Sequence, residues 1–414
     1  NLCLLVQEPV HSPLCWICTL LMSSQVRLKL LPSARCLFDD PIQVKVAGLR
    51  SRQVVTMRAR STDERGMVFS SLGTYRADGN GEIDVDKDPS LSGSYIGVEP
   101  MGLLWSMKPD ILHKRFQKTN SLNPHVVRFS VHEEEGEGRM LAEETNERLL
   151  IGDGVSRIPV KEGNIRGVLF TPPGKGPFPA VLNIGTLISE KRASLLSNKG
   201  FVVLTVGVYN DKPANVKEIH LDYYEEAVDF LRRHPKVGSK GVGVISQSKG
   251  GDVALSLAAF VPGVEAVVWI NGWQRQCCLS SFLQKHKILS ALMFDTNKVI
   301  RTRVWRLHCE VYVDDPRAEE NKGSLVPIER AKGRFLFVAS EDDLNWDSKT
   351  YMDMMVERLK HHGKDNFERW CYSGAGHYLE PIVGKPVQWG GEPKSHAAAE
   401  VHLWKKIRSS SGLT

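Results

Sequence analysis

The chain has 414 residues, a formal net charge of +6, 42% hydrophobic residues and 25% charged residues. These proportions are close to globular averages and exclude a disordered, collagen-like or coiled-coil chain. The length favours two domains, and the small basic excess is dispersed among acidic residues, which argues against a dedicated nucleic-acid binder.

Residues 1–22 are expected to form an extension outside the functional fold. Their longest apolar run, residues 14–22, is about half of the ~18 residues that a membrane span needs. No Lys or Arg precedes this run, so it makes a poor signal peptide, and the same absence argues against a transit peptide. We therefore expect no membrane span.

The eight cysteines do not indicate a disulfide scaffold in a chain of this length. Cys15 and Cys18 form one Cys-x-x-Cys pair, but no second pair at matching spacing follows, so no metal site is expected. Reduced thiols in a cytosol-like compartment are predicted for the cysteines without an evident partner, which are Cys36, Cys277, Cys278, Cys309 and Cys371.

Between residues 25 and 135 the sequence predicts short strands joined by turns. Residues 42–46 alternate apolar and polar side chains with period two, and the other expected strands are 54–60, 69–75, 83–85 and 126–131. The Asp-Gly-Asn-Gly turn at 78–81 tolerates the positive φ that hairpins need. Short strands at regular spacing predict a β-sandwich. The charged run 132–135 is interpreted as solvated rather than metal-binding.

From about residue 146 the pattern changes to alternating strands and helices. A helix is expected at 215–234 and another from about 249, between buried strands at 167–170, 179–184, 201–206, 241–245, 264–270 and 335–338. This alternation predicts a mostly parallel sheet with helices on both faces. The weakly periodic stretch 273–330 is expected to form a cap or insertion.

Residues 243–252 carry the most informative motif. A buried strand ends, a sharp turn follows, and a helix begins, which is the context of a nucleophile elbow with Ser248 at its centre. Gly250 supplies the small residue two positions after the serine, whereas Ser246 stands where glycine is usual. A serine in such a turn is also often only a helix cap, so the motif alone leaves both interpretations open.

A serine nucleophile needs a base and an orienting carboxylate, and this fold places them in the order serine, acid, histidine. Asp342 and Asp343 follow the strand at 335–338, and either could serve, or both could cap the next helix. His377 follows a strand at 369–372 on a glycine-rich loop. The poorer candidates are His361 and His362, expected on a helix face, and His220, expected within a helix at the edge of the core.

The sequence resembles the type I acyl-CoA thioesterases and the related bile acid-CoA:amino acid N-acyltransferases over nearly everything from residue 23 to 404. The segments that carry the resemblance are Arg192-Ala193-Ser194-Leu195-Leu196, Ser248-Lys249-Gly250-Gly251, Trp269-Ile270-Asn271-Gly272, Asp342-Asp343-Leu344-Asn345-Trp346 and Gly376-His377-Tyr378-Leu379-Glu380-Pro381. The resemblance implies an immunoglobulin-like β-sandwich at 23–145 followed by an α/β-hydrolase domain at 146–410. It also implies a catalytic triad of Ser248, Asp343 and His377.

The implied reaction is hydrolysis of a fatty acyl-CoA through an acyl-serine, with no cofactor. One oxyanion donor should be the backbone N–H of Lys249, and the other should come from Gly185 or Thr186. The loop after Ile184 looks shorter than in the relatives. Two alternatives follow: conjugation of the acyl group to glycine or taurine, where that branch typically uses cysteine as nucleophile, and a catalytically impaired acyl-CoA-binding protein.

The remaining expectations concern partners and location. The partner is a fatty acyl-CoA, with no nucleic acid, and the chain is expected to be a monomer or weak homo-oligomer. His113-Lys114-Arg115 and Lys285-His286-Lys287 are possible cations for CoA phosphates, although solvated faces are the favoured interpretation. Residues 411–414 do not match a Ser-Lys-Leu-type peroxisomal address, so the cytosol is expected, with mitochondria and peroxisomes as alternatives.

Overall fold

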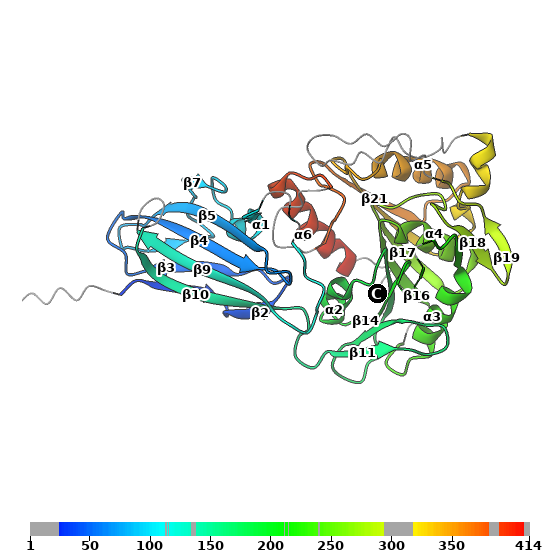
Figure 1. Cartoon of the computed structure of the whole chain (residues 1–414), viewed down its shortest axis with the longest axis horizontal. Helices are drawn as coiled ribbons and strands as arrows, with labels where there is room; N and C mark the ends of the chain where they lie inside the picture. The colour runs from blue at the N-terminus through cyan, green and yellow to red at the C-terminus, as the bar shows by residue number, and fades with distance from the viewer. Residues whose placement is uncertain are drawn as a thin grey trace, which may run out of the picture.

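The structure is a computed structural model, and it describes residues 25–111, 114, 116–133, 138–210, 212–213, 215–238, 241–293, 318–380 and 389–409. The expectations for residues 1–22, Cys309, His113 and Arg115 therefore lie outside the described residues, as do the four residues at 411–414. Figure 1 shows two parts side by side along the long axis, one built of strands and the other of a sheet covered by helices.

The N-terminal part consists of two sheets. The smaller, antiparallel sheet has the order β1-β3-β6, formed by Arg27–Leu31, Gln43–Ala47 and Ile83–Asp84. The larger sheet has the order β2-β10-β9-β4-β5-β7, with β8 also paired to β5. Its strands are β2 (Arg35–Leu37), β4 (Val54–Thr62), β5 (Val68–Arg76), β7 (Ser92–Gly93), β8 (Lys108–Pro109), β9 (His125–Glu133) and β10 (Met140–Leu149).

The period-two pattern explains how these sheets pack. In β9, Val127, Phe129 and Val131 are fully buried while the residues between them face outward. These side chains share one core with Val44 and Val46 of the smaller sheet. The five expected strands are therefore confirmed. β10 was not expected, and it runs through residue 145, where the sequence placed the boundary between domains.

The C-terminal part is built on an eight-stranded sheet of order β11-β12-β14-β13-β16-β17-β20-β21. The pairs β11–β12 and β12–β14 are antiparallel, and the other neighbouring pairs of the sheet are parallel. The strands are β11 (Ser156–Val160), β12 (Gly167–Thr171), β13 (Ala180–Gly185), β14 (Val202–Gly207), β16 (Val242–Gln247), β17 (Val264–Ile270), β20 (Arg334–Ser340) and β21 (Phe367–Tyr372). Every residue of β13, β14 and β16 is buried, as their continuous apolar runs predict.

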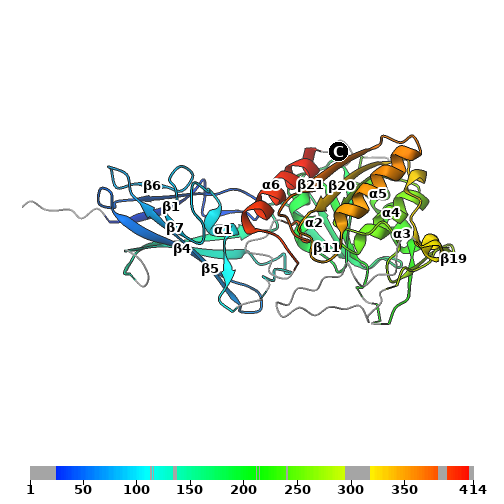
Figure 2. The same ribbon diagram turned by 90° about the horizontal axis from the view of Figure 1, so that it is seen from above.

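Helices cover both faces of this sheet, as predicted. One face carries α3 (Leu221–Arg233), α4 (Gly250–Phe260) and α5 (Ser348–His361), whose apolar side chains share one core. The other carries α2 (Glu190–Ser197) and α6 (Pro393–Ser409), whose apolar side chains belong to the core that continues into the N-terminal sheets. The short helix α1 (Gly102–Trp105) contacts α6. Figure 2 shows α6 between the two parts of the molecule.

The helix expected at 215–234 begins later than the sequence indicated. Ile219 fits the apolar stripe of a helix, but β15 (Glu218–His220) pairs in parallel with β18 (Ser280–Leu283), and α3 starts only at Leu221. Pairing with a distant strand has overridden the local helical pattern. The expectation that His220 lies within a helix at the core edge is wrong, because it is an exposed residue at the end of a strand.

The stretch at 273–330 is only partly described, since residues 294–317 lie outside the described ranges. Its described portion contains β18, β19 (His286–Leu289) and two short 3-10 helices, Glu319–Ser324 and Ile328–Arg330. β15, β18 and β19 form a small separate sheet beside α3, and the cap stays a prediction. In the part of the chain that the structure covers, no helix combines the length and apolar character that a membrane span requires.

Candidate active site

Ser248 lies on a strained turn at the end of β16. Its φ of 57° is in the left-handed region, which a non-glycine residue adopts only when the surrounding structure imposes it. A Cβ atom at Gly250 would come within 2.4 Å of the Ile184 carbonyl oxygen, so only glycine lets α4 approach β13 this closely. Ser246 replaces the usual glycine and is accommodated, because its hydroxyl donates to the Val268 carbonyl at 3.2 Å.

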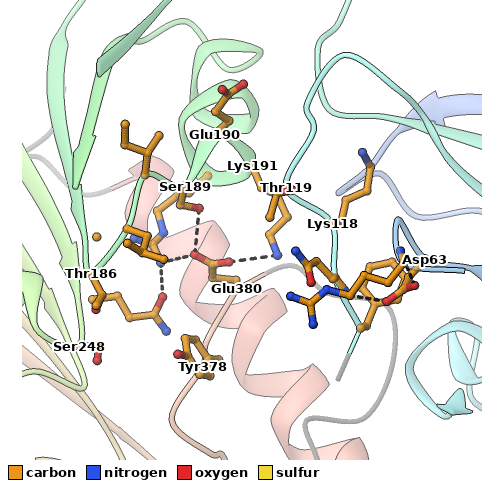
Figure 3. Close-up of a pocket in the computed structure, with 18 of the residues that line it drawn as sticks. Asp63, Lys118, Thr119, Thr186, Ser189, Glu190, Lys191, Ser248, Tyr378 and Glu380 are labelled. Carbon is orange, nitrogen blue, oxygen red and sulfur yellow. Dashed lines mark hydrogen bonds and ion pairs between the residues drawn. The ribbon is translucent and has the colours of Figure 1, made fainter. Parts of the chain in front are cut away.

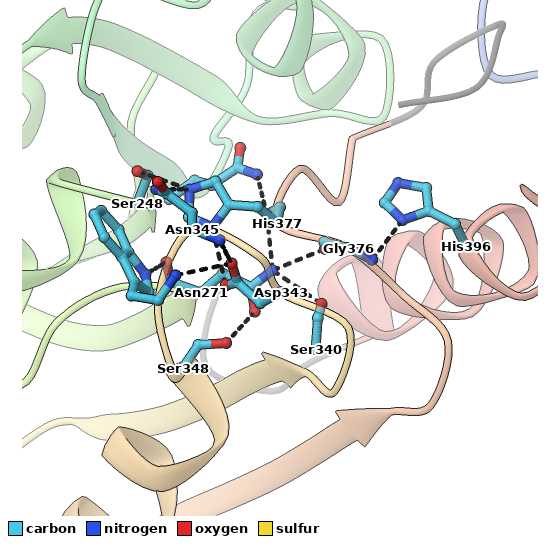
Figure 4. A network of polar contacts seen from close by, with 11 residues as sticks. Ser248, Asn271, Ser340, Asp343, Asn345, Ser348, Gly376, His377 and His396 are labelled. Carbon is cyan, nitrogen blue, oxygen red and sulfur yellow. Dashed lines mark hydrogen bonds and ion pairs between the residues drawn. The ribbon is translucent and has the colours of Figure 1, made fainter. Parts of the chain in front are cut away.

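The structure brings Ser248, His377 and Asp343 together (Figure 4). His377 Nε2 lies 2.9 Å from Ser248 Oγ, and His377 Nδ1 lies 2.9 Å from Asp343 Oδ2. The His377 and Asp343 side chains are 0% and 1% exposed. These distances place Nδ1 to donate to the carboxylate and Nε2 to accept the serine hydroxyl.

The local contacts also separate the alternatives that the sequence left open. Asp342 Oδ2 accepts a hydrogen bond from the Gly391 N–H at 2.7 Å, so its carboxylate is turned to a different loop. The cap of α5 is Asp347, which accepts from Thr350 N–H at 3.0 Å. At the start of α4 the capping position falls on Lys249, with no capping hydrogen bond from a side chain. Ser248 and Asp343 therefore do not serve as helix caps.

Asn271 is a polar residue near the triad to which the sequence alone assigned no role. It follows β17, has a φ of 45°, and is fully buried. Its side-chain amide donates to the carbonyl of His377 at 2.8 Å and to Ser340 Oγ at 2.9 Å. Trp346 packs edge-on against the His377 ring at 4.9 Å and donates its indole N–H to the Asn271 carbonyl. Asn271 thus fixes the backbone that carries the histidine.

Arg192 is a second residue that sequence analysis gave no role. Its guanidinium, with the side chain only 2% exposed, donates to Glu380 Oε1 at 2.7 Å and to the side-chain oxygen of Gln247. Gln247 immediately precedes Ser248, and its own amide donates to the His377 carbonyl at 3.2 Å. Burial lowers the pKa of Arg192, an effect that the Glu380 carboxylate opposes. Arg192 therefore connects the serine turn with the histidine loop.

We expect Arg192→Met to lower kcat about 10- to 100-fold with a much smaller change in KM, because a displacement near 1 Å in a catalytic group can cost that much. Steady-state kinetics and a circular-dichroism melt of the same preparation measure the two effects separately. The matched control is Arg157→Met. Arg157 pairs with Glu190, which lies on the same helix as Arg192, but Arg157 does not contact the triad. A folded Arg192→Met variant with unchanged kcat would contradict this role.

A cavity of about 1030 Å³ opens beside Ser248, between the two parts of the molecule. Its C-terminal wall includes Gly185, Thr186 and Ser248, so the residues expected to supply the second oxyanion donor face the same space as the serine. Its N-terminal wall is formed by Asp63, Arg65, Met67, Lys114 and residues 116–119. Figure 3 shows the two walls, with Glu380 and Lys191 between them. The oxyanion roles of Gly185, Thr186 and the Lys249 N–H stay predictions.

Other predicted residues lie elsewhere. The Lys249 side chain is buried, and its ammonium contacts Asp252 and the Cys277 carbonyl instead of the cavity. Lys114 lines the cavity, whereas Lys285, His286 and Lys287 belong to the hairpin of β18 and β19, outside the cavity wall. The described cysteines are all thiols, with the sulfur atoms of Cys277 and Cys278 3.1 Å apart.

A serine, histidine and aspartate meeting at the ends of parallel strands, with the serine on a strand-to-helix turn, define the class of α/β hydrolases. Comparison with known proteins gives the family. Residues 39–162 match the model described as "Acyl-CoA thioester hydrolase/BAAT N-terminal region", and residues 219–409 match "BAAT / Acyl-CoA thioester hydrolase C terminal". The chain belongs to this family.

Full-length relatives agree with that assignment. The chain is 38% identical over 405 residues to mouse acyl-coenzyme A thioesterase 1, covering 93% of this chain and 96% of the relative. It is 40% identical over 399 residues to mouse acyl-coenzyme A thioesterase 3, covering 91% and 92%. Among solved structures, an acylaminoacyl peptidase in complex with a chloromethyl ketone is 14% identical with a TM-score of 0.44, covering 90% of this chain and 74% of that one.

Proposed function

We propose that the protein is an acyl-CoA thioesterase that hydrolyses fatty acyl-CoA to a free fatty acid and CoA. Ser248 is the nucleophile, His377 the general base and Asp343 the carboxylate that orients the imidazole. The observation that carries this proposal is the 2.9 Å contact between Ser248 Oγ and His377 Nε2, with Asp343 on the other ring nitrogen. Family membership supplies the thioester as the substrate bond.

The reaction proceeds in two halves. His377 Nε2 takes the proton of Ser248 as Oγ attacks the thioester carbonyl, and the charge on the carbonyl oxygen is stabilised by backbone N–H groups of Lys249 and the loop at 185–186. The imidazolium then protonates the departing CoA sulfur. Water enters, His377 takes its proton, and attack on the acyl-serine releases the fatty acid and restores Ser248.

The serine nucleophile favours hydrolysis over conjugation to an amino acid. An acyl-cysteine is a thioester whose good leaving group lets an amine accept the acyl chain. An acyl-serine is an oxygen ester, and we expect water to hydrolyse it. The cavity wall retains Gly185 and Thr186 beside Ser248, which supports a catalytic role over a purely binding one.

The test is CoA release from palmitoyl-CoA, followed with a thiol reagent. We expect Ser248→Ala to reduce kcat by at least about 10⁴-fold, since losing a triad serine costs up to ~10⁶. Mass spectrometry with added glycine or taurine detects any amide product. A fluorophosphonate probe that labels wild type and spares Ser248→Ala reports an activated serine independently of turnover. Equal CoA release by the two proteins would overturn the proposal.

Two finer assignments belong to the same proposal. The packing of two largely antiparallel sheets through one core supports an immunoglobulin-like description of the N-terminal part. Free thiols at all the described cysteines support a reducing compartment, for which we propose the cytosol.

A further inference from the structure

We propose that the N-terminal wall of the cavity binds the phosphorylated nucleotide arm of CoA, with Arg65 and Lys114 as its phosphate ligands. This inference rests on the proposed function and specifies from which side the substrate enters the site. The thioester would reach Ser248 along the space between the two parts of the molecule, with the nucleotide held by the sandwich.

The first support is the continuity of the cavity. One space is lined by Ser248 and Gln247 at one side and by Arg65 and Lys114 at the other. Its volume of about 1030 Å³ lies just above the ~300–1,000 Å³ typical of ligand pockets. A long substrate with a reactive thioester at one end and a charged group at the other fits such a space.

The second support is the arrangement of charge. Each acidic side chain of the cavity wall already has partners within the protein. Glu190 pairs with Arg157 at 2.7 Å, Glu380 pairs with Arg192 at 2.7 Å, and Asp63 accepts three backbone N–H groups. These carboxylates already interact with groups of the protein. The cationic side chains of the wall are therefore the charged groups available to a ligand.

The cationic side chains of the cavity wall differ in whether they already pair with a carboxylate of the protein. Lys191 pairs with Glu380, and Lys118 pairs with Glu64 at 2.9 Å. Arg65 and Lys114 are exposed, and within the described ranges neither forms an ion pair. Arg and Lys are the residues that recognise phosphate in proteins, Arg through its planar fork and Lys as a point charge. The 3′-phosphate and pyrophosphate of CoA are the anionic groups of the proposed substrate.

The third support is that this wall is held in place before any ligand binds. Glu64 accepts hydrogen bonds from Thr119 N–H at 2.8 Å, from Asn120 N–H at 2.8 Å and from the Lys118 ammonium at 2.9 Å. Burial alone would raise the pKa of Glu64, but these hydrogen bonds lower it to about 2. The adjacent Asp63, in the same turn, accepts a hydrogen bond from Gln117 N–H at 3.1 Å. The two carboxylates fix residues 117–120 against the turn that carries Arg65, which reduces the entropy lost on binding.

An acyl chain is a poorer occupant of this wall. An alkyl chain placed there would remove water from Arg65 and Lys114 and return no hydrogen bond, which is costly for charged groups. A phosphate group satisfies the same two side chains. The cavity wall therefore favours the nucleotide arm.

The experiment compares one acyl group on two carriers, CoA and N-acetylcysteamine, which provides the same thioester without a nucleotide. For Arg65→Glu/Lys114→Glu we expect KM for the acyl-CoA to rise at least about tenfold with kcat nearly unchanged. KM for the cysteamine thioester should stay within about twofold of wild type. Raising NaCl should increase the wild-type KM for acyl-CoA much more than that of the double variant, because salt screens exposed charges.

The matched control is Arg27→Glu/Lys29→Glu, which makes the same change in net charge on β1, outside the cavity wall. An equal rise in KM for this control, an unchanged KM for acyl-CoA in the cavity variant, or an equal loss with both thioesters would overturn the inference while the thioesterase function stood. If wild type cleaved neither thioester, the proposed function would fail instead. Calorimetric titration with adenosine 3′,5′-bisphosphate then decides the inference alone: binding by wild type that the cavity variant weakens at least about tenfold supports it, and equal or absent binding overturns it.

Discussion

Asp343→Asn is expected to lower kcat by about 10⁴-fold, the loss seen when the triad aspartate of a serine protease is changed in this way. The carboxylate accepts a hydrogen bond from His377 Nδ1 at 2.9 Å. An amide in its place can donate to that nitrogen and hold the ring in the tautomer that carries its proton on Nε2. Such a ring cannot accept the proton of Ser248. Both side chains are buried, so water does not substitute for the lost carboxylate.

The neighbouring residue provides the control for this measurement. Asp342→Asn makes the same chemical change one position earlier, and its amide oxygen can still accept from the Gly391 N–H. We expect its kcat to stay within about tenfold of wild type. If steady-state kinetics gave the large loss to Asp342→Asn and the small one to Asp343→Asn, the acid would be misassigned.

Lys249→Met is expected to lower the free energy of unfolding by about 3–5 kcal/mol, the usual cost of leaving one member of a buried ion pair without its partner. The Lys249 and Asp252 side chains are 7% and 0% exposed, and their charged groups are in direct contact. Burial alone would lower the pKa of Lys249, but the Asp252 carboxylate raises it. The substitution leaves the Lys249 backbone N–H unchanged, so the effect is on stability first. Urea unfolding followed by circular dichroism measures it.

A double-variant cycle isolates the pair itself. Lys249→Met/Asp252→Asn removes both charges but keeps an oxygen that can accept from Cys277 N–H, which lies 2.9 Å from the carboxylate. We expect the double variant to be more stable than Lys249→Met by at least about 2 kcal/mol. Strictly additive losses would show that the two charges are not coupled.

The elements predicted well from the sequence are those whose pattern reflects burial in the sheet. β14 and β16 are buried along their whole length and read as continuous apolar runs, and β9 alternates with period two. β10 was not predicted because acidic and other polar residues dominate it and only Asn146 and Arg148 are fully buried. The start of α3 was misplaced because the partner of Ile219 is Ser281, a residue that no local window includes.

The residues of the candidate site also differ in how far a local sequence pattern could predict them. Ser248, His377 and a carboxylate at Asp342 or Asp343 could be proposed because each follows a strand and their order is characteristic of the fold, and the family resemblance then implied Asp343. Spacing could not choose between Asp342 and Asp343, since their partners, Gly391 for Asp342 and His377 for Asp343, lie far along the chain. Arg192 could not be assigned a role, because its partners Gln247 and Glu380 are 55 and 188 residues away in sequence. A residue that acts by joining distant segments leaves no local pattern.

The contacts of α6 have a consequence for biosynthesis. His396 accepts the N–H of Gly376 at 3.0 Å, and Glu400 accepts the N–H of Glu380 at 3.0 Å, so both flanks of the His377 loop are anchored to this helix. Trp404 of the same helix donates to Asp39 in the N-terminal part at 2.8 Å. All three triad residues are translated before α6, yet these two anchors form only after this helix has left the ribosome. A premature stop codon just before α6 would therefore yield a protein that has every triad residue but lacks both of these anchors of the His377 loop.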